Sequence, residues 1–429
     1  MNAGNIVDAF VSDSKWNSVP AKRLFTSSKE INQGMKETNR LALTMKGVIN
    51  RSLDDLQGLQ SSDYSVYQIF EKDDLVFKLI DLENIKTSRV GIVHERGIMS
   101  PAYIRVSANS NSIYPRFYYW YFFALYLTNI YNKLGGGVRQ NLTAGDLLEI
   151  PVPLIDISLQ KQVSTFLDRE TQRIDSLIEE KQTFIKLLKE KRQALISHVV
   201  TKGLNPNVEM QDSGIEWIGQ VPKHWIVRRL KHTSTLQSGI AKGKDNAGKE
   251  TLSVPMLRVA NVQDGYVKLD DVHEINVLPH EAERYALKDG DVLMNEGGDN
   301  DKLGRGTVWK EQIKPCIHQN HVFVIRVTDI EPEWLGWLTQ SAYAKFYFFR
   351  VSKQSTNLAS ISSTNVKEVH LLIPPADERK IIMEYLEKQT SKLKLLVQDV
   401  EQSIALLKEH RASLISAAVT GKIDVREAV

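Results

Sequence analysis

The chain has 429 residues, of which 42% are apolar and 25% charged, a composition typical of a globular protein with enough apolar surface for two or three domains. Its net charge of +3 and pI near 8.6 are only mildly basic, so they permit nucleic-acid binding without arguing for it. The single cysteine, Cys316, excludes an internal disulfide framework or a cysteine-rich metal site and fits a reducing, cytoplasmic compartment.

Two features of the first domain bear on membranes. At the N-terminus no basic segment precedes an apolar run, so we expect no signal peptide. The most apolar stretch, FYYWYFFALYL at Phe117–Leu127, is about half as long as a membrane-spanning helix. We therefore predict that it is a buried helix and that the chain has no membrane partner. The aromatic segment Trp334–Phe349 is predicted to be a core helix as well.

Two blocks of sequence recur 219 residues later, with no gap needed between them. FLDRETQRIDSLI at Phe166–Ile178 aligns with YLEKQTSKLKLLV at Tyr385–Val397. KEKRQALISHVVT at Lys189–Thr201 aligns with KEHRASLISAAVT at Lys408–Thr420. Weaker similarities upstream pair DLVF with DVLM, and YIRV with VIRV. Self-similarity of this kind indicates one structural unit used twice.

The repeat predicts a mixed α/β (α+β) fold. We expect two similar globular domains, related by a pseudo-twofold internal repeat and separated by two long antiparallel coiled-coil helices. Short alternating stretches such as Val254–Val262 and His321–Val327 are typical of strands. DSGIEWIGQVPKHW at Asp212–Trp225 marks the start of the second domain, where its tryptophans are expected to be packing anchors. The predicted boundaries are 1–155 (first domain), 156–203 (first helix), 204–375 (second domain), 376–422 (second helix) and 423–429 (C-terminal tail).

Both long segments place residues at a seven-residue spacing that is mostly apolar, which is typical of a coiled coil. A helix of roughly 40 residues is about 60 Å long, more than one small domain can cover. We therefore predict that the two copies pair with each other in antiparallel fashion; pairing with another chain is the alternative. The predicted helix interface consists of Leu167, Ile174, Leu177, Leu188, Leu195, Leu386, Leu393, Leu396, Val400, Leu407 and Leu414.

No catalytic motif stands out. The sequence has no phosphate-binding G-x-x-x-x-G-K-[ST], no convincing dinucleotide motif, no H-E-x-x-H and no amino-methyltransferase tetrapeptide. The most site-like stretch, EGGDNDKLGRG at Glu296–Gly306, mimics the start of a calcium loop. It has Lys310 at the twelfth position, where such a loop needs glutamate, so we predict no metal site. Its glycines would let the backbone approach a phosphate, with Lys302 and Arg305 as donors; a hairpin loop with solvated charges is the alternative.

Two similar but diverged domains on a rigid helical pair would suit two unlike DNA half-sites, one to two turns of about 34–36 Å apart. Arginine can bind guanine, asparagine and glutamine can bind adenine, and lysine mostly neutralises phosphate. For any single residue an ordinary surface role is the alternative. The predicted DNA contacts are Lys36, Arg51, Lys86, Arg89, Arg139, Gln140, Asn141, Lys242, Lys244, Arg258, Asn261, Lys302, Arg305, Lys353 and Gln354.

The chain also resembles a known family, the specificity (S) subunits of type I restriction–modification systems. DSGIEWIGQVPKHW, LRVANVQDG at Leu257–Gly265, GDVLMNEGGDNDKLGRG at Gly290–Gly306 and the LIS-x-x-VT end of both helices match its pattern. The similarity covers essentially the whole chain. The first domain departs from the common pattern, with SKWNSVPAKRL at Ser14–Leu24 as a faint equivalent of the opening motif.

The resemblance implies that each domain is a target-recognition domain for one half of a split, asymmetric DNA sequence. It implies that the helices set the gap between the halves and dock two modification subunits, which carry S-adenosylmethionine and methylate adenine. Restriction subunits with ATP-driven translocation and nuclease activity, and hence Mg²⁺, would join them. The chain itself would be non-catalytic, without a cofactor, and cytoplasmic. The alternatives are a stand-alone DNA-modifying enzyme and a coiled-coil scaffold that binds only proteins.

Overall fold

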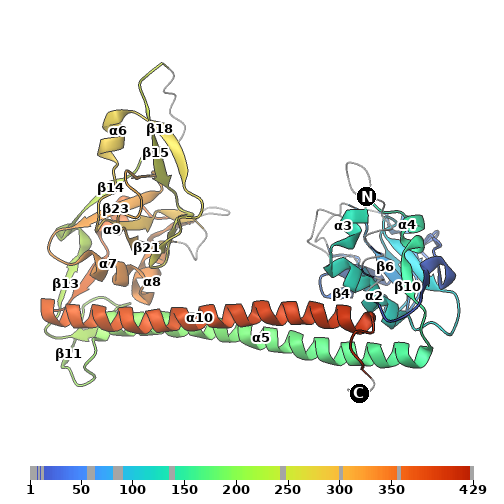
Figure 1. The fold of residues 1–429 in the computed structure, drawn as a ribbon. Coiled ribbons are helices and arrows are strands. Elements are labelled where there is room, and N and C mark those ends of the chain that lie inside the picture. The colour runs from blue at the N-terminus through green and yellow to red at the C-terminus, as the bar shows by residue number, and fades with distance from the viewer. Residues whose placement is uncertain are drawn as a thin grey trace. The chain divides into compact units, whose positions relative to one another are not determined.

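The computed structural model describes residues 7, 10, 14–55, 63–80, 90–134, 141–241, 248–298, 303–354 and 359–425. The chain divides into two compact units, the first comprising Met1–Gln182 and Gln402–Val429 and the second Thr183–Glu401. Each unit therefore holds one globular part and one stretch of each long helix, α5 and α10 (Figure 1). None of the helices in the described ranges is long and apolar enough to cross a membrane.

In its described residues, the first unit has ten strands ahead of the long helix. The strands are β1 (Ser18–Pro20), β2 (Phe25–Thr26), β3 (Arg40–Thr44), β4 (Gly47–Arg51), β5 (Gln68–Phe70), β6 (Leu75–Phe77), β7 (Val90–Ile92), β8 (Gly97–Met99), β9 (Ile104–Ala108) and β10 (Pro151–Pro153), as found in the described ranges. The helices are α2 (Pro115–Leu127), α3 (Ile130–Leu134), α4 (Ala144–Glu149) and α5 (Ile157–Lys202), with 3₁₀ turns at Ala21–Arg23 and Tyr64–Val66.

The second unit begins with the hairpin β11 (Met210–Asp212) and β12 (Gln220–Pro222). Its other strands are β13 (Ile226–Arg229), β14 (Ser234–Ser238), β15 (Leu252–Leu257), β16 (Val262–Gln263), β17 (Tyr266–Val267), β18 (His273–Val277), β19 (Val292–Asn295), β20 (Gly297–Gly298), β21 (Gly306–Val308), β22 (Ile317–His318), β23 (Val322–Val327), β24 (Lys353–Gln354), β25 (Ala359–Ser360) and β26 (His370–Ile373). Its helices are α6 (Pro279–Arg284), α7 (Pro332–Thr339), α8 (Ala342–Val351), α9 (Ser363–Lys367) and α10 (Ala376–Val419), with a 3₁₀ turn at Leu230–His232.

The two units share one sheet topology, which confirms the internal repeat. An antiparallel sheet has the order β2-β9-β6-β7 in the first unit and β14-β23-β19-β21 in the second. A second sheet shares three strands with one antiparallel and one parallel pair, β4-β3-β8 in the first unit and β18-β15-β22 in the second, and β5 extends it in the first unit. The two-stranded sheets β1-β10 and β13-β26 also correspond. The short sequence echoes DLVF/DVLM and YIRV/VIRV lie on equivalent central strands of this frame.

Two predicted elements differ from the structure in detail. The predicted strand at Val254–Val262 is broken, because a turn follows β15 and the chain resumes as β16. The predicted helix at Trp334–Phe349 is two helices, α7 and α8, and Ser341 caps the second by accepting a hydrogen bond from the Ala344 N–H at 3.4 Å. Phe117–Leu127 is the predicted buried helix, with Phe117, Tyr118 and Phe122 fully enclosed.

The tryptophans of the segment that opens the second domain are packing residues, as predicted. Trp225 is 3% exposed and meets Trp334 edge to face, with 6.2 Å between ring centroids. Trp217 is half-buried and stacks on Tyr347. Gly203, which follows α5, has a φ of +73°, as the residue after a helix end often does.

α5 and α10 pair in antiparallel fashion within each unit (Figure 1). In the first unit the early part of α5, around Leu167, packs in one core with Ile415 and Val419 near the end of α10. In the second unit the late part of α5, around Ile196, packs with Leu386 near the start of α10. Leu167, Ile174, Leu188, Leu386 and Val400 of the predicted interface are buried, and Leu177, Leu195, Leu393, Leu407 and Leu414 are half-buried.

One interface residue was predicted wrongly. Leu396 is 40% exposed, whereas Ile404 on the same helix is 8% exposed. The side chains of the stripe that faces the partner helix are spaced alternately by four and three residues, from Leu386 through Thr390 and Leu393 to Val397. A count of three from Leu393 therefore leaves the stripe, and a count of four keeps it.

Candidate nucleic-acid interface

The glycine-rich loop of the second unit ends in Arg305, which lies against a tight hairpin. β16 and β17 form this hairpin, with Asp264 and Gly265 at its turn. Gly265 has a φ of +83°, which glycine adopts without strain, and its N–H donates to the Gly306 carbonyl at 3.0 Å. Nη1 of Arg305 donates to Oε1 of Gln263 at 3.0 Å. The half-buried guanidinium is thus oriented by the hairpin, as a group that reads a base edge should be.

A small sheet brings two predicted clusters together. β25 pairs with both β20 and β24, so Ser360 lies between Gly297 and Lys353. A Cβ on Gly297 would lie 2.8 Å from the Ala359 carbonyl oxygen, which explains why glycine stands there. Lys353 and Gln354 are exposed on β24, which β25 separates from β20 at the start of the Glu296–Gly306 loop. The sequence placed these residues in separate stretches, and the sheet makes them one surface.

The prediction that Asn261 contacts a base is wrong. Its side chain is 2% exposed, and its Nδ2 donates to the carbonyls of Lys268 at 2.9 Å and Asp271 at 3.0 Å. Its Oδ1 accepts from the N–H of Arg258 at 2.9 Å. Both amide protons are therefore used inside the protein, and Asn261 fixes the loop between β15 and β18. A buried amide with all of these internal hydrogen bonds stabilises the loop.

Arg258 is half-buried and is engaged within the loop. Its Nη2 lies 2.9 Å from Oδ2 of Asp271, whose other oxygen is 2.9 Å from Nε2 of His273. The hydrogen bond from Arg258 is the main cause that holds the pKa of the Asp271 carboxyl below its ordinary value. A phosphate or base that recruits Arg258 must compete with this carboxylate.

In the first unit the predicted contacts come from separate segments. Lys36 is exposed in the loop before β3, and Asn141 is exposed ahead of α4. Arg51 ends β4 and lies 3.8 Å from Asp55. Seven of the predicted contacts fall outside the described residues: Lys86, Arg89, Arg139, Gln140, Lys242, Lys244 and Lys302.

An exposed polar cluster of the first unit escaped the sequence analysis. Nδ2 of Asn50 donates to Oδ1 of Asn39 at 3.1 Å and also to Glu95, while Nε2 of His94 lies 2.8 Å from Oδ1 of Asn50. These residues come from three segments that only the pairing of β3, β4 and β8 brings close, so no sequence pattern announces them. Amide and imidazole groups on an exposed strand can hydrogen-bond base edges.

The equivalent hairpin of the second unit carries different polar groups. β15 and β18 correspond to β3 and β4, and there the Ser253 hydroxyl donates to Oε2 of Glu274 at 2.7 Å. The frame is thus repeated while the side chains on its surface are not. Two recognition surfaces built in this way would prefer different ligands.

A chain of polar contacts links α5 to the hairpin that holds Arg305. Nζ of Lys345 donates to Oδ2 of Asp264 at 2.7 Å and to Oε1 of Gln193 at 3.0 Å. Nη2 of Arg192 donates to Oε1 of Gln340 at 2.6 Å. A Cβ on Gly265 would lie 2.8 Å from that same Oε1, so the hairpin turn rests directly on the pair. The long helix therefore helps to set the position of the turn.

Two buried titratable side chains belong to the core. Burial raises the pKa of the Cys316 thiol to about 12 and lowers that of His318 to about 4. Nδ1 of His318 lies 2.7 Å from the Val322 carbonyl oxygen, which occupies it. In the parts of the chain that the structure describes, no group of three or more His, Cys, Asp or Glu side chains is arranged to hold a metal ion.

Comparison with known proteins matches this architecture. A family model described as a type I restriction modification DNA specificity domain matches residues 15–187. The type I restriction enzyme EcoKI specificity subunit of Escherichia coli K12 is 23% identical over 311 residues, 71% of this chain and 64% of that protein. The putative type I restriction enzyme MjaX specificity subunit of Methanocaldococcus jannaschii is 23% identical over 207 residues, 47% of each chain. The chain thus spans less than two thirds of these two relatives.

A solved structure agrees on the fold. A chain from a study of the assembly and conformational transition of the type I R-M system superimposes with a TM-score of 0.71 at 15% identity, covering 95% of this chain and 98% of that one. With the repeated frame, the paired helices and a specificity-domain model that matches residues 15–187, this chain is similar to the specificity subunits of type I restriction–modification systems.

Proposed function

We propose that this chain is the DNA-reading subunit of a type I restriction–modification complex and that it recognises a bipartite, asymmetric sequence. The observation that carries the proposal is one sheet frame built twice with unlike polar surfaces, Asn39, Asn50 and His94 in one unit and Ser253 and Glu274 in the other. Equivalent frames present equivalent surfaces to a duplex, and unlike side chains on them prefer unlike base pairs.

Partner docking forms the second part of the proposal. Leu187 of α5 is 54% exposed, and Leu406 of α10, 219 residues later, is 59% exposed. A large apolar residue exposed at the same position of both copies is typical of a surface that two copies of one partner cover. These partners would be methyltransferase subunits that bind S-adenosylmethionine and methylate adenine.

The chemistry in this proposal lies on the partners. Restriction subunits, joined through the methyltransferase subunits, would supply ATP-driven translocation and Mg²⁺-dependent cleavage. This chain would contribute the choice of sequence and the spacing between the half-sites, without catalysis of its own.

The test is a reconstituted complex of this chain with the methyltransferase subunit of the same system, selected against a pool of random duplex DNA. We expect an enriched motif of two different short halves with a fixed gap. We also expect its affinity to fall steeply as the salt concentration rises, because phosphate contacts release counterions. Methyl transfer by the chain alone would contradict the proposal in favour of a stand-alone enzyme. An unenriched pool and salt-independent retention would favour a protein-only scaffold.

A further inference from the structure

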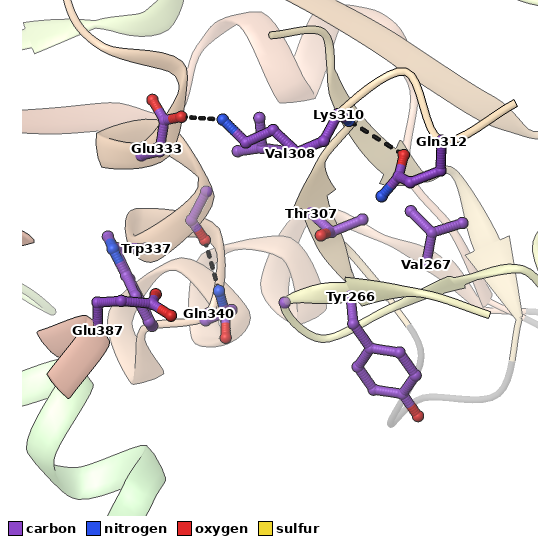
Figure 2. Close-up of a pocket in the computed structure, with 12 residues that line it drawn as sticks. Tyr266, Val267, Thr307, Val308, Lys310, Gln312, Glu333, Trp337, Gln340 and Glu387 are labelled. Carbon is purple, nitrogen blue, oxygen red and sulfur yellow. Dashed lines mark hydrogen bonds and ion pairs between the residues drawn. The ribbon is translucent and has the colours of Figure 1, made fainter. Parts of the chain in front are cut away.

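A cavity of about 320 Å³ opens on the second unit (Figure 2). Its walls include Gly336 and Trp337 of α7, Gln340 directly after that helix, Tyr266 of the β16–β17 hairpin and Glu387 of α10. Aromatic, amide and carboxylate groups therefore share one opening. The internal repeat shows what occupies the same place in the first unit.

α2 of the first unit and α7 of the second are equivalent helices, each bonded at its N-terminus to the same position of a long helix, through a backbone N–H before α2 and a side-chain carboxylate before α7. The residue before α2 is Tyr114, whose N–H donates to Oε1 of Gln160 at 2.6 Å. The residue before α7 is Glu331, which accepts from Nη2 of Arg379 at 3.2 Å. Gln160 and Arg379 are 219 residues apart, the offset between the two long helices. The first turns of α2 and α7 can thus be matched residue by residue.

In the first unit this place is filled by a guanidinium group. Arg116 donates from Nε at 2.9 Å and from Nη2 at 2.7 Å to Oδ1 of Asp168 on α5. Its Cζ lies 4.8 Å from the ring centroid of Tyr119 and 5.3 Å from that of Trp120. The indole Nε1 of Trp120 donates to the same carboxylate oxygen at 2.8 Å. Cation, aromatic rings and carboxylate form one closed set.

The second unit keeps the carboxylate and the indole of this set and has no arginine at the position that matches Arg116. Glu387 is the counterpart of Asp168, and Trp337 is the counterpart of Trp120. The counterpart of the arginine is Glu333, which pairs with Lys310 (Figure 2). The counterpart of the tyrosine is Gly336, which has no ring and lines the cavity, and a Cβ there would lie 3.0 Å from Cγ2 of Val308.

The groups that remain suit a planar cation. An indole face attracts a guanidinium group, and a carboxylate can accept two parallel hydrogen bonds from it. Glu387 is exposed and accepts a hydrogen bond from the Ser391 hydroxyl at 3.3 Å. Burial lowers the pKa of Arg192, and the charges of Asp264 and Glu387 oppose that shift, so Glu387 lies near this guanidinium as well as in the cavity wall.

We propose that this cavity takes the guanidinium group of an arginine side chain from a partner protein, stacked on Trp337 and bonded to Glu387. The inference rests on the docking part of the proposed function and gives that docking surface a chemical anchor. Leu395 is 61% exposed and follows Glu387 and Ser391 at steps of four residues, so all three share one face of α10. A partner protein that covers Leu395 would lie on the same face of α10 as Glu387 of the cavity wall.

The cavity can be tested on the full chain without a partner. The seven tryptophans are labelled with 5-fluorotryptophan, and Trp337→Phe assigns the signal of interest in the ¹⁹F spectrum. We expect ethylguanidinium to shift that signal with half-saturation on the order of millimolar, as for a single side chain. Glu387→Gln should weaken the response at least about fivefold, and Gly336→Tyr should abolish it. An unsaturable shift, or an equal response to ethylammonium, would overturn the proposal.

The partner is tested with a variant that fills its own cavity. Glu333→Arg recreates the arginine of the first unit, while Glu333→Gln breaks the pair with Lys310 without filling the space. We expect Glu333→Arg and Gly336→Tyr to weaken binding of the methyltransferase subunit at least about tenfold and Glu333→Gln to leave it near wild type. If Glu333→Arg and Gly336→Tyr both bind the subunit with wild-type affinity, the role of the cavity is overturned and the proposed function is not. A wild-type chain that does not bind the subunit would instead contradict the proposed function.

Discussion

Arg105 and Asp74 form a buried ion pair across the central strands of the first unit, with 2.5 Å between Nε and Oδ2. Arg326 and Asp291 form the same pair in the second unit, at 2.7 Å. In both units the aspartate also accepts an N–H from the residue three positions earlier, which closes the turn before the strand. The repeat is therefore preserved in its internal polar contacts as well as in its strand order.

Asp74→Asn should destabilise the first unit by about 3 kcal/mol, because it leaves the Arg105 guanidinium buried without its counter-charge. Hydrogen exchange of β6 and β9 should accelerate, while β19 and β23 stay protected. Glu30→Gln is the matched control, since that carboxylate is half exposed and 3.8 Å from the same guanidinium. Its effect should be below about 0.5 kcal/mol. Equal exchange in the two variants would show that the pair contributes little.

The corrected helix interface gives a pair of variants that differ only in position. Leu386→Asp should cost at least about 3 kcal/mol, because it places a carboxylate in a fully buried site of the second core. Leu396→Asp should change stability by less than about 0.5 kcal/mol, because that side chain is 40% exposed. Thermal unfolding measures both. A large loss of stability in Leu396→Asp would show that Leu396 belongs to the helix interface after all.

Arg305 and Asn261 should respond differently to alanine substitution. Arg305→Ala should relax the preference at one position of one half-site by about 1–3 kcal/mol, because a base contact is lost. Asn261→Ala should lower stability by about 1–3 kcal/mol, because three internal hydrogen bonds are lost, and should leave the base preference unchanged. Selection from random DNA and thermal unfolding separate the two effects. Equal loss at both half-sites in Arg305→Ala would contradict two independent recognition surfaces.

Lys345→Met tests whether α5 positions the hairpin. The variant keeps the stem of the side chain but breaks the links to Asp264 and Gln193, so the turn beside Arg305 should loosen. We expect the variant to bind its unaltered target DNA several-fold more weakly. The slope of affinity against salt concentration should stay unchanged, because no phosphate contact is removed. A changed slope would mean that Lys345 contacts DNA directly.

His318 predicts a pH dependence of stability. Burial holds its pKa at about 4, against 6.5 for the unperturbed side chain. Between these values the unfolded chain binds a proton that the folded chain does not, so stability falls as the pH is lowered from 6.5 and levels off near 4. The full effect is about 3 kcal/mol. His318→Asn should flatten this part of the pH profile; an unchanged profile would contradict the buried neutral imidazole.

The sequence predicts the parts of this fold that are encoded locally. The repeat at an offset of 219 and the heptad spacing locate both long helices to within a few residues of Ile157–Lys202 and Ala376–Val419. The prediction for Leu396 was wrong because an α-helix has 3.6 residues per turn, so the residue three positions after Leu393 lies outside the buried stripe. The order of strands in the sheets could not be predicted from the sequence, because it depends on pairings such as β3 with β8 that join distant segments.

The candidate site was less predictable than the fold. Residue type alone cannot distinguish an asparagine that reads a base from one that staples a loop, and Asn261 is the second kind. The cluster of Asn39, Asn50 and His94 is assembled across strands, so its members look unrelated in the sequence. The proposed role of Arg305 rests on the glycines that precede it in the sequence, and it stays a prediction.

The central claim is that each unit reads its own half of a split DNA sequence. The most direct measurement maps methylated adenines in the genome of a cell that carries this chain with its methyltransferase subunit. The same map is made in a second cell, in which the chain carries Arg305→Ala in its second unit, Thr183–Glu401. We predict one bipartite, asymmetric motif with a fixed gap, of which only one half becomes degenerate in the variant. A continuous motif, or loss of preference in both halves together, would contradict the claim.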